Sequence, residues 1–146
     1  MPKTVVVALE ETPYRAVATA GRHVIMFDEP ESLGGGGTAP EPSDALLAAL
    51  GSCSLITMKM YAARKNWDLQ TAAMELSKTT ERTPDGQRAV IRRLITLGGN
   101  LTDEQRERLM QIAMQCPVAR LLTGEVVIES ELAPARGGNA VIIACP

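Results

Sequence analysis

The longest run of apolar positions in this chain lies between residues 43 and 65. Its sequence, SDALLAALGSCSLITMKMYAARK, is apolar on nearly every side of a helix for most of its length. A helix that is apolar all round has to be buried all round. The pattern therefore predicts a central helix over 43–65, begun by Ser43 as its N-cap, with the rest of the fold packed about it.

Shorter segments, in which apolar and polar residues alternate or β-branched residues cluster, predict β-strands on both sides of this helix. The predicted strands are residues 3–9, 14–19, 23–27, 69–80, 88–97 and 125–132. The first three form a small antiparallel meander. The fourth and fifth flank Thr83–Gly86, where proline followed by Asp-Gly indicates a turn, and they form a long hairpin. The glycine-rich stretch 28–42 joins the meander to the central helix as a flexible loop.

A second helix is predicted after the hairpin. Thr102 and Gln105 form a capping box, and the apolar stripe continues to about Cys116, where a proline ends the helix. The order of elements is βββ, helix, ββ, helix, β, which predicts an α+β fold with antiparallel strands. We assign a single domain to residues 1–132. The pattern does not place the tail, residues 133–146.

The composition of the 146 residues fits one domain with a core of Leu, Ile, Val, Met and Ala, because 45% are apolar and only 3% are aromatic. The net charge of −2 does not indicate a positively charged surface that would bind nucleic acid or an anionic membrane. The longest apolar run, interrupted by Gly51, Ser52 and Ser54, is too short for a membrane span, and the N-terminus lacks the pattern of a signal peptide. We expect a soluble, cytoplasmic protein without membrane or nucleic-acid partners.

Three cysteines in a cytoplasmic chain are more typical of reduced thiols than of a disulfide framework. Cys53 and Cys116 lie on the inner faces of the two predicted helices. Each can simply be a small buried hydrophobic residue. If the helices pack together, however, the two sulfurs can meet and form a redox pair. Cys145, in the tail, receives no role.

A reactive Cys53 needs a cation, because it lies well past the first turn of its helix and burial raises the pKa of a thiol. The candidate cations are Arg15 and Arg22 in the meander, although each can equally be an ordinary exposed arginine. Cys116 lies at the predicted C-terminus of its helix, where the dipole disfavours a thiolate. It therefore suits the role of a second thiol rather than that of the first attacker.

Other site chemistries are disfavoured by the residues present. His23 is the only histidine and the chain has no CxxC pair, so a zinc site would need all three cysteines to converge. The single histidine also argues against a Ser-His-Asp triad. The run Gly34–Gly37 lacks the lysine and hydroxyl residue of a phosphate-binding loop. We expect neither a metal nor a cofactor.

Several motifs together resemble the OsmC/Ohr family of thiol peroxidases, and most closely its OsmC-like branch. They are DEPESLGGGG, APEPSDALLAALGSC, MYAARK and the CPV segment at Cys116, and the resemblance covers about residues 17–132. It implies an intertwined homodimer of α+β subunits with each active site at the subunit interface. It also implies that Cys53 is the peroxidatic cysteine, Cys116 the resolving cysteine and Arg22, rather than Arg15, the catalytic arginine.

The resemblance further implies a reaction in oxidative-stress defence. Cys53 attacks a hydroperoxide, Cys116 closes a disulfide with it, and a thiol or a lipoyl-type dithiol reduces the pair. The apolar walls formed by Leu46, Leu50 and Met60 suit an organic hydroperoxide. This antioxidant chemistry requires no metal or nucleotide.

One position departs from the family pattern. In the Ohr branch, a glutamate that pairs with the catalytic arginine occupies the position that is Ser43 here. Asp44 or Glu41 is the possible acid partner in this chain. The departure leaves open an alternative function, in which the fold binds a small apolar ligand or senses stress without significant peroxidase activity.

Overall fold

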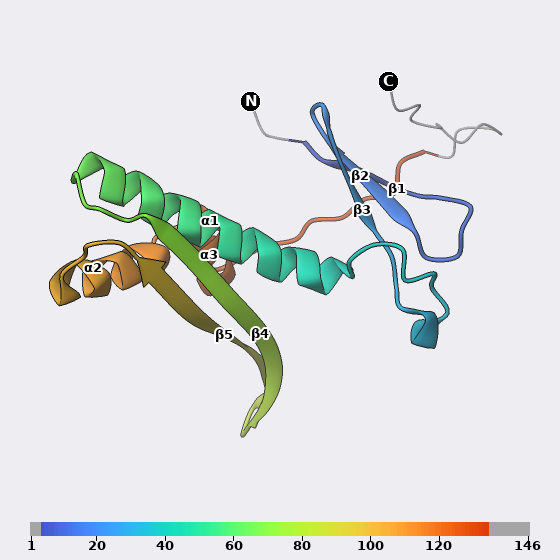
Figure 1. The fold of residues 1–146 in the computed structure, drawn as a ribbon. Helices are drawn as coiled ribbons and strands as arrows, with labels where there is room; N and C mark the ends of the chain where they lie inside the picture. The colour runs from blue at the N-terminus through green and yellow to red at the C-terminus, as the bar shows by residue number, and fades with distance from the viewer. Residues whose placement is uncertain (1–3, 135–146) are drawn as a thin grey trace.

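The computed structural model describes residues 4–134, which form two parts joined by a loop (Figure 1). The first part is a three-stranded antiparallel sheet with β2 in the middle. The second part is a long helix with a β-hairpin and two further helices packed beside it. The elements are β1 (Val6–Leu9), β2 (Ala16–Ala20), β3 (His23–Phe27), η1 (Glu31–Leu33), α1 (Pro42–Arg64), β4 (Thr71–Thr83), β5 (Gly86–Gly98), α2 (Asp103–Ala113) and α3 (Pro117–Thr123).

The sheet of β1, β2 and β3 is the antiparallel meander that the sequence predicts. Its central strand places Ala18 opposite Ile25, and Ala18 is buried. Val24 and Ile25 are neighbours in β3, so their side chains point to opposite faces of the sheet. Both are exposed, at 42% and 50%. Within residues 4–134, neither face of this sheet is therefore fully covered.

Asp28 orders the loop between the sheet and α1. Its carboxylate accepts hydrogen bonds from the backbone N–H groups of Glu29 and Thr38, at 2.9 and 3.0 Å, and from the Thr38 hydroxyl at 2.7 Å. A Cβ on Gly35 would lie 2.0 Å from the Glu29 carbonyl oxygen, so only glycine permits this turn. The glycine-rich stretch predicted as a flexible loop thus has a defined set of internal contacts.

Helix α1 begins slightly earlier than predicted, with Glu41 rather than Ser43 at the N-cap position. The prediction of all-round burial is wrong for the single chain, because Leu46, Ile56 and Met60 are 43%, 59% and 58% exposed. The hairpin and the two shorter helices all lie on one side of α1 (Figure 1). The buried residues on that side are Leu50, Gly51, Ser54, Met58 and Ala62.

By length and apolar composition alone, α1 would also suffice to cross a membrane, which contradicts the prediction that its apolar run is too short. The core helix of a soluble protein passes the same test. Since β4, α2 and α3 all contact α1, one side of it packs as a core helix does.

Strands β4 and β5 form one long hairpin, closed by the pair Thr83 and Gly86. The predicted turn is confirmed. Near the helices, residues at alternate positions of the two strands are half-buried, from Ala72 to Leu76 in β4 and from Ile91 to Leu97 in β5. Residues 77–80 and 86–89, nearer the turn, are exposed. A Cβ on Gly51 would lie 2.8 Å from Leu76 Cδ1, so the glycine allows α1 to approach β4 closely.

The capping box of α2 is confirmed: Thr102 Oγ1 accepts from the Gln105 N–H at 3.2 Å, and Gln105 Oε1 accepts from the Thr102 N–H at 3.0 Å. The predicted end of this helix is wrong. Helix α2 ends at Ala113, and Cys116 is instead the N-cap of α3. Pro117 explains the break, because it disfavours helical geometry at the residue before it and fits the first position of a new helix.

The strand predicted over 125–132 is not formed. Val127, Ile128 and Leu132 are 75%, 85% and 99% exposed. A strand needs a neighbour to pair its backbone groups, and within residues 4–134 no strand pairs with this segment. The rest of the tail, with Cys145, lies outside the described residues.

Two clusters of buried residues lie against α1. The larger one contains Met58, Ala62, Leu69, Leu109, Ile112 and Ala113. The smaller one contains Leu50, Cys116 and Ala119. The predicted α+β fold is confirmed, and the second cluster positions the candidate site.

Candidate active site

Cys53 and Cys116 meet in the smaller buried cluster, against the middle of α1. Helix α1 presents Cys53 half-buried, whereas the start of α3 presents Cys116 with no exposed surface. Leu50 and Ala119 pack around the pair. The two helices therefore bring together the two thiols that the sequence singled out.

Polar groups surround the Cys116 sulfur. The Ser54 hydroxyl oxygen lies 3.3 Å from it, and the Ala119 N–H donates to it at 3.3 Å. Burial raises the pKa of the Cys116 thiol, but hydrogen bonds from Ser54, Ala119 and Cys53 lower it, and the net effect is a lowered pKa. The prediction that Cys116 sits where a thiolate is disfavoured is therefore wrong, because this residue caps the start of α3 instead of ending α2.

Arg93 of β5 brings a positive charge to this cluster. Its Nη1 donates to Ser54 Oγ at 3.2 Å and to the Ala113 carbonyl oxygen at 3.5 Å. Sequence reasoning missed this residue. The available signal was an arginine at an inward-facing position of β5, between Ile91 and Ile95, where the alternation favours an apolar side chain.

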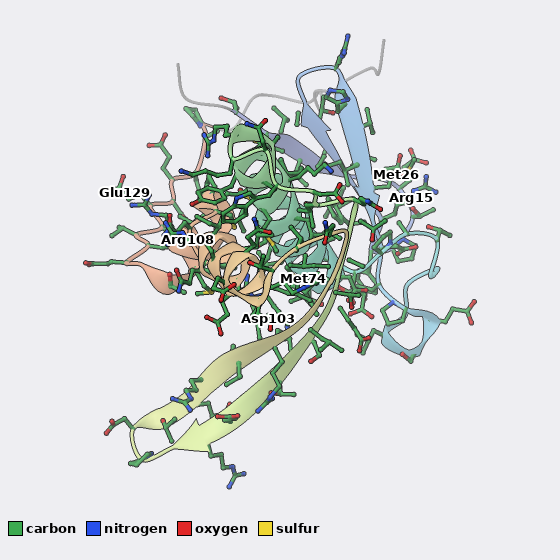
Figure 2. All side chains as sticks on the ribbon, turned by 60° about the vertical axis from the view of Figure 1, so that its left-hand side comes forward. Arg15, Met26, Met74, Asp103, Arg108 and Glu129 are labelled. Atoms are coloured by element: carbon green, nitrogen blue, oxygen red, sulfur yellow. The ribbon has the colours of Figure 1, made fainter. Side chains whose placement is uncertain are left out.

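The structure does not bring Arg22 or Arg15 to the cysteines within one chain. Arg22 is exposed in the two-residue turn between β2 and β3. Arg15 Nε lies 2.8 Å from Glu10 Oε2, without the angle of a hydrogen bond, and Arg15 Nη2 donates to Met26 Sδ at 2.8 Å. Figure 2 shows Arg15 and Met26 together on the sheet, away from the α2 residue Arg108.

Of the other predicted site residues, only Leu50 reaches the cysteine cluster. Glu41 and Asp44 lie at the start of α1 and form no ion pair within residues 4–134. Leu46 and Met60 lie on the exposed side of the helix. Leu50 borders a groove of about 240 Å³, whose other walls include Ile91, Arg93, Ala119 and Leu122. Neither cysteine lines this groove, but Leu50 and Ala119 also belong to the cysteine cluster.

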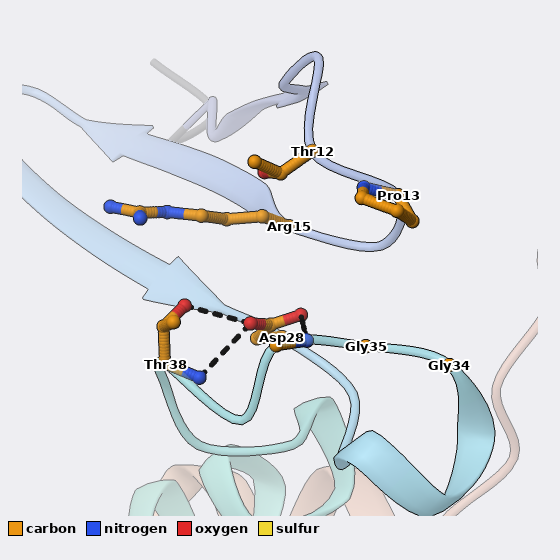
Figure 3. Close-up of a pocket in the computed structure, with 8 residues that line it drawn as sticks. Thr12, Pro13, Arg15, Asp28, Gly34, Gly35 and Thr38 are labelled. Carbon is orange, nitrogen blue, oxygen red and sulfur yellow. Dashed lines mark hydrogen bonds between the residues drawn. The ribbon is translucent and has the colours of Figure 1, made fainter.

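A second cavity, of about 170 Å³, lies between the β1–β2 loop and the glycine-rich loop (Figure 3). Its walls include Arg15, Asp28 and Thr38. Hydrogen bonds from the Thr38 backbone and hydroxyl, followed by those from other backbone groups of the loop, lower the pKa of Asp28 to about 2. Since these donors occupy the carboxylate, Asp28 serves the loop rather than the thiol site.

Metal-ligating residues do not gather in the described part of the chain. No group of three His, Cys, Asp or Glu side chains there could hold an ion. His23 is exposed at the first position of β3. The arrangement thus offers two thiols, one hydroxyl and one guanidinium for chemistry.

Comparisons with known proteins extend this description. A family model described as OsmC-like protein matches residues 34–131. No curated protein sequence matches the chain. A solved structure from Psychrobacter arcticus 273-4, described as an osmotic stress induced and detoxification response protein, is similar with a TM-score of 0.69 at 26% identity, over 82% of this chain and 88% of that one.

Two further solved structures share the fold at lower identity. An OsmC-like protein from Mycoplasma pneumoniae has a TM-score of 0.71 at 19% identity, over 85% of this chain and 89% of that one. A Legionella pneumophila protein described as an organic hydroperoxide resistance protein has a TM-score of 0.63 at 20% identity, over 83% and 90%. Both likenesses concern the arrangement of helices and strands.

Proposed function

This chain belongs to the family of OsmC-like proteins, and on that premise we propose that it is a thiol-dependent peroxidase that reduces organic hydroperoxides in oxidative-stress defence. The observation that carries the proposal is the meeting of two thiols with different surroundings. Cys53 is partly exposed, whereas Cys116 is buried and accepts hydrogen bonds that favour its thiolate.

The difference in exposure supports an assignment of roles to the two cysteines. The attacking sulfur has to meet a peroxide that arrives from solvent, and Cys53 has exposed surface while Cys116 has none. A resolving thiolate has to reach only the oxidised partner sulfur, which lies in the same cluster. Cys53 is therefore the peroxidatic residue and Cys116 the resolving one in our proposal.

The reaction then has three steps. The Cys53 thiolate attacks the hydroperoxide, the O–O bond breaks, the alkoxide leaves and takes up a proton as an alcohol, and Cys53 becomes a sulfenic acid. The Cys116 thiolate attacks the Cys53 sulfur, the S–O bond breaks and hydroxide leaves as water after protonation. A lipoyl-type dithiol supplies two electrons and two protons, which restores both thiols and releases the oxidised dithiol.

The cation that activates Cys53 is Arg22 of a second subunit in this proposal. Three observations support a homodimer: both faces of the N-terminal sheet expose apolar residues, α1 exposes Ile56 and Met60, and Arg22 lies at a hairpin tip. A second copy whose sheet covers the open side of α1 would bury both apolar surfaces. It would also bring a guanidinium to Cys53, which stabilises a thiolate.

The groove that shares Leu50 and Ala119 with the cysteine cluster supports an organic substrate. Its walls are mostly apolar, with Arg93 at one side, so an organic hydroperoxide fits it better than hydrogen peroxide. We place the protein in the cytoplasm, where reduced thiols persist. Asp44 and Glu41 remain candidates for an acid that pairs with Arg22 once the dimer is formed.

Consumption of an organic hydroperoxide in the presence of a lipoyl-type dithiol tests the proposal. The wild type is expected to turn over, and Cys53→Ser is expected to fall to the rate without protein. Cys116→Ser should complete one turnover and then be over-oxidised at Cys53. Ser52→Ala is the matched control, because Ser52 is exposed and bonds only to the Ala49 carbonyl of its own helix.

Equal, slow consumption by the wild type and by Cys53→Ser would contradict the peroxidase proposal. The second candidate is then the binding of a small apolar ligand, which the groove of about 240 Å³ favours. A related structure from Vibrio cholerae, described as an organic hydroperoxide resistance protein, holds captopril in one active site. Saturable binding of an apolar probe without its consumption would support that candidate.

A further inference from the structure

The Ser54 hydroxyl has one hydrogen and faces two acceptors. Its oxygen lies 3.2 Å from the Ala113 carbonyl oxygen and 3.3 Å from the Cys116 sulfur. One hydroxyl hydrogen cannot serve both acceptors at once, although the oxygen can also accept. Ser54 has no exposed surface, so bulk water does not reach it to supply a second donor.

The two protonation states of Cys116 require different positions of that hydrogen. A Cys116 thiol can donate to Ser54 Oγ while Ser54 donates to the Ala113 carbonyl. A Cys116 thiolate has no hydrogen and only accepts, so the Ser54 hydroxyl has to turn toward it. The turn would leave the buried Ala113 carbonyl without its serine donor, which costs free energy unless another donor replaces it.

Arg93 is that other donor. Its Nη1 lies 3.2 Å from Ser54 Oγ and 3.5 Å from the Ala113 carbonyl oxygen, so it stays paired in either state. A positive donor on Ser54 Oγ also polarises the O–H bond and strengthens the hydrogen bond that it gives. The Nη2 group contacts the Met114 sulfur.

We propose that Ser54 and Arg93 form a hydroxyl switch that stabilises Cys116 as the thiolate that attacks oxidised Cys53. The proposal deepens the peroxidase function above and rests on it. In the step concerned, the Cys116 to Cys53 S–S bond forms, the S–O bond of the sulfenic acid breaks, and hydroxide leaves as water with one proton from solvent. Ser54 and Arg93 are positioning residues, because they act through Cys116.

A thiolate titration tests the switch without any peroxide. The double variant Cys53→Ser/Cys145→Ser leaves Cys116 as the only one of the three cysteines, and its ultraviolet thiolate absorbance is followed against pH. Adding Ser54→Ala to the double variant is expected to raise the midpoint of the Cys116 titration by about one pH unit, because the thiolate loses a hydrogen bond from the serine hydroxyl. Ser52→Ala in the same background should leave the midpoint unchanged.

Variants of Arg93 in the Cys53→Ser/Cys145→Ser background distinguish the effect of its positive charge on Cys116 from a structural effect. Arg93→Met is expected to raise the midpoint, and Arg93→Lys to restore part of the shift. The matched control is Arg92→Met, because Arg92 is the next residue in β5, points outward and bonds to Thr79 and Glu81. If Arg93→Met does not fold, Ser54→Ala decides the question, since it removes only one buried oxygen atom.

A kinetic test of the switch uses protein that keeps all three cysteines, rapidly mixed with one equivalent of organic hydroperoxide. In Ser54→Ala, sulfenic acid formation at Cys53 should keep its rate, while disulfide closure slows about tenfold. An unchanged Cys116 midpoint in Ser54→Ala, or equal closure rates, would overturn the switch. If the wild type consumes no hydroperoxide, the peroxidase function fails by itself, whereas the titration still measures the effect of Ser54 and Arg93 on Cys116.

Discussion

The two parts of this chain differ in how completely they bury their apolar residues. In the helical part, Met58, Leu109 and Ala113 have 0% exposure. In the N-terminal sheet, Val7 and Ile25 are 60% and 50% exposed, although both belong to paired strands. One side of α1 is thus packed by residues of its own chain, whereas its other side, with Ile56 and Met60, and the sheet are not.

This difference separates the residues to which we assign a function. The thiols, Ser54 and Arg93 lie together in the packed part, so one chain assembles them. Arg22 lies on the sheet, whose surface is open. We infer that one subunit provides the redox pair and that association with a second subunit completes the site.

Truncation of the packed core has the largest expected effect on stability. Met58→Ala removes a side chain with 0% exposure, and it should lower the free energy of unfolding by about 2–5 kcal/mol. Met110→Ala is the matched control, because Met110 is 49% exposed on α2 and should change that free energy by roughly 0.5 kcal/mol or less. Urea unfolding monitored by circular dichroism measures both, and equal losses would contradict the assigned core.

A charge introduced on the exposed N-terminal sheet should weaken the association of two subunits. Ile25→Asp places a carboxylate on an apolar face that we expect the second subunit to cover. The dissociation constant of the dimer should rise about tenfold or more, because apolar burial is lost. Sedimentation at several protein concentrations checks this. A wild type that is a stable, folded monomer at all of them would contradict the dimer.

Acid should loosen the loop that joins the two parts. The pKa of Asp28 is lowered from 3.8 to about 2 in the folded chain. Its contribution to stability is therefore fully present above the unfolded value and is lost as pH falls from there through the folded value. Protection of the Thr38 amide against hydrogen exchange, taken relative to the intrinsic rate at each pH, should fall in that acid range, and in Asp28→Asn it should already be low near neutral pH. An unchanged Thr38 amide in Asp28→Asn would count against this role.

The smallest expected effect concerns the start of α2. Thr102→Ala removes the hydroxyl that accepts from the Gln105 N–H and should lower the free energy of unfolding by about 1 kcal/mol. The change is local, so turnover of hydroperoxide should be unaffected. Thermal unfolding of Thr102→Ala beside Thr80→Ala, a threonine on the exposed hairpin, measures the difference.

Local signals in the sequence suffice for most elements of the fold. The capping box at Thr102, the turn Thr83–Gly86 and the apolar run of α1 each depend on neighbouring residues, and each predicts the correct type of structure. Boundaries are less accurate: Pro117 indicates the end of one helix, although it also begins another. This misplaced boundary puts Cys116 at the end of a helix, where a thiolate is disfavoured, although it lies at the start of α3.

Features that depend on contacts between distant segments are not accessible from the sequence. The alternation of β5 indicates that Arg93 points inward, but its approach to Ser54 depends on how the whole hairpin packs against the helices, which no local pattern specifies. The exposure of residues 125–132 depends on whether a partner strand exists. The thiol pair is predictable because both cysteines continue apolar stripes in the sequence, whereas the contacts of the hydroxyl and the guanidinium beside them are not.

Mixed dimers test the division of the site between two subunits most directly. Cys53→Ser and Arg22→Ala, each expected to be inactive alone, are unfolded together, refolded as a mixture and assayed for hydroperoxide consumption with a lipoyl-type dithiol. If Arg22 of one subunit serves Cys53 of the other, the mixture regains activity through one intact site in each mixed dimer. Mixed dimers that form but remain inactive would contradict this account.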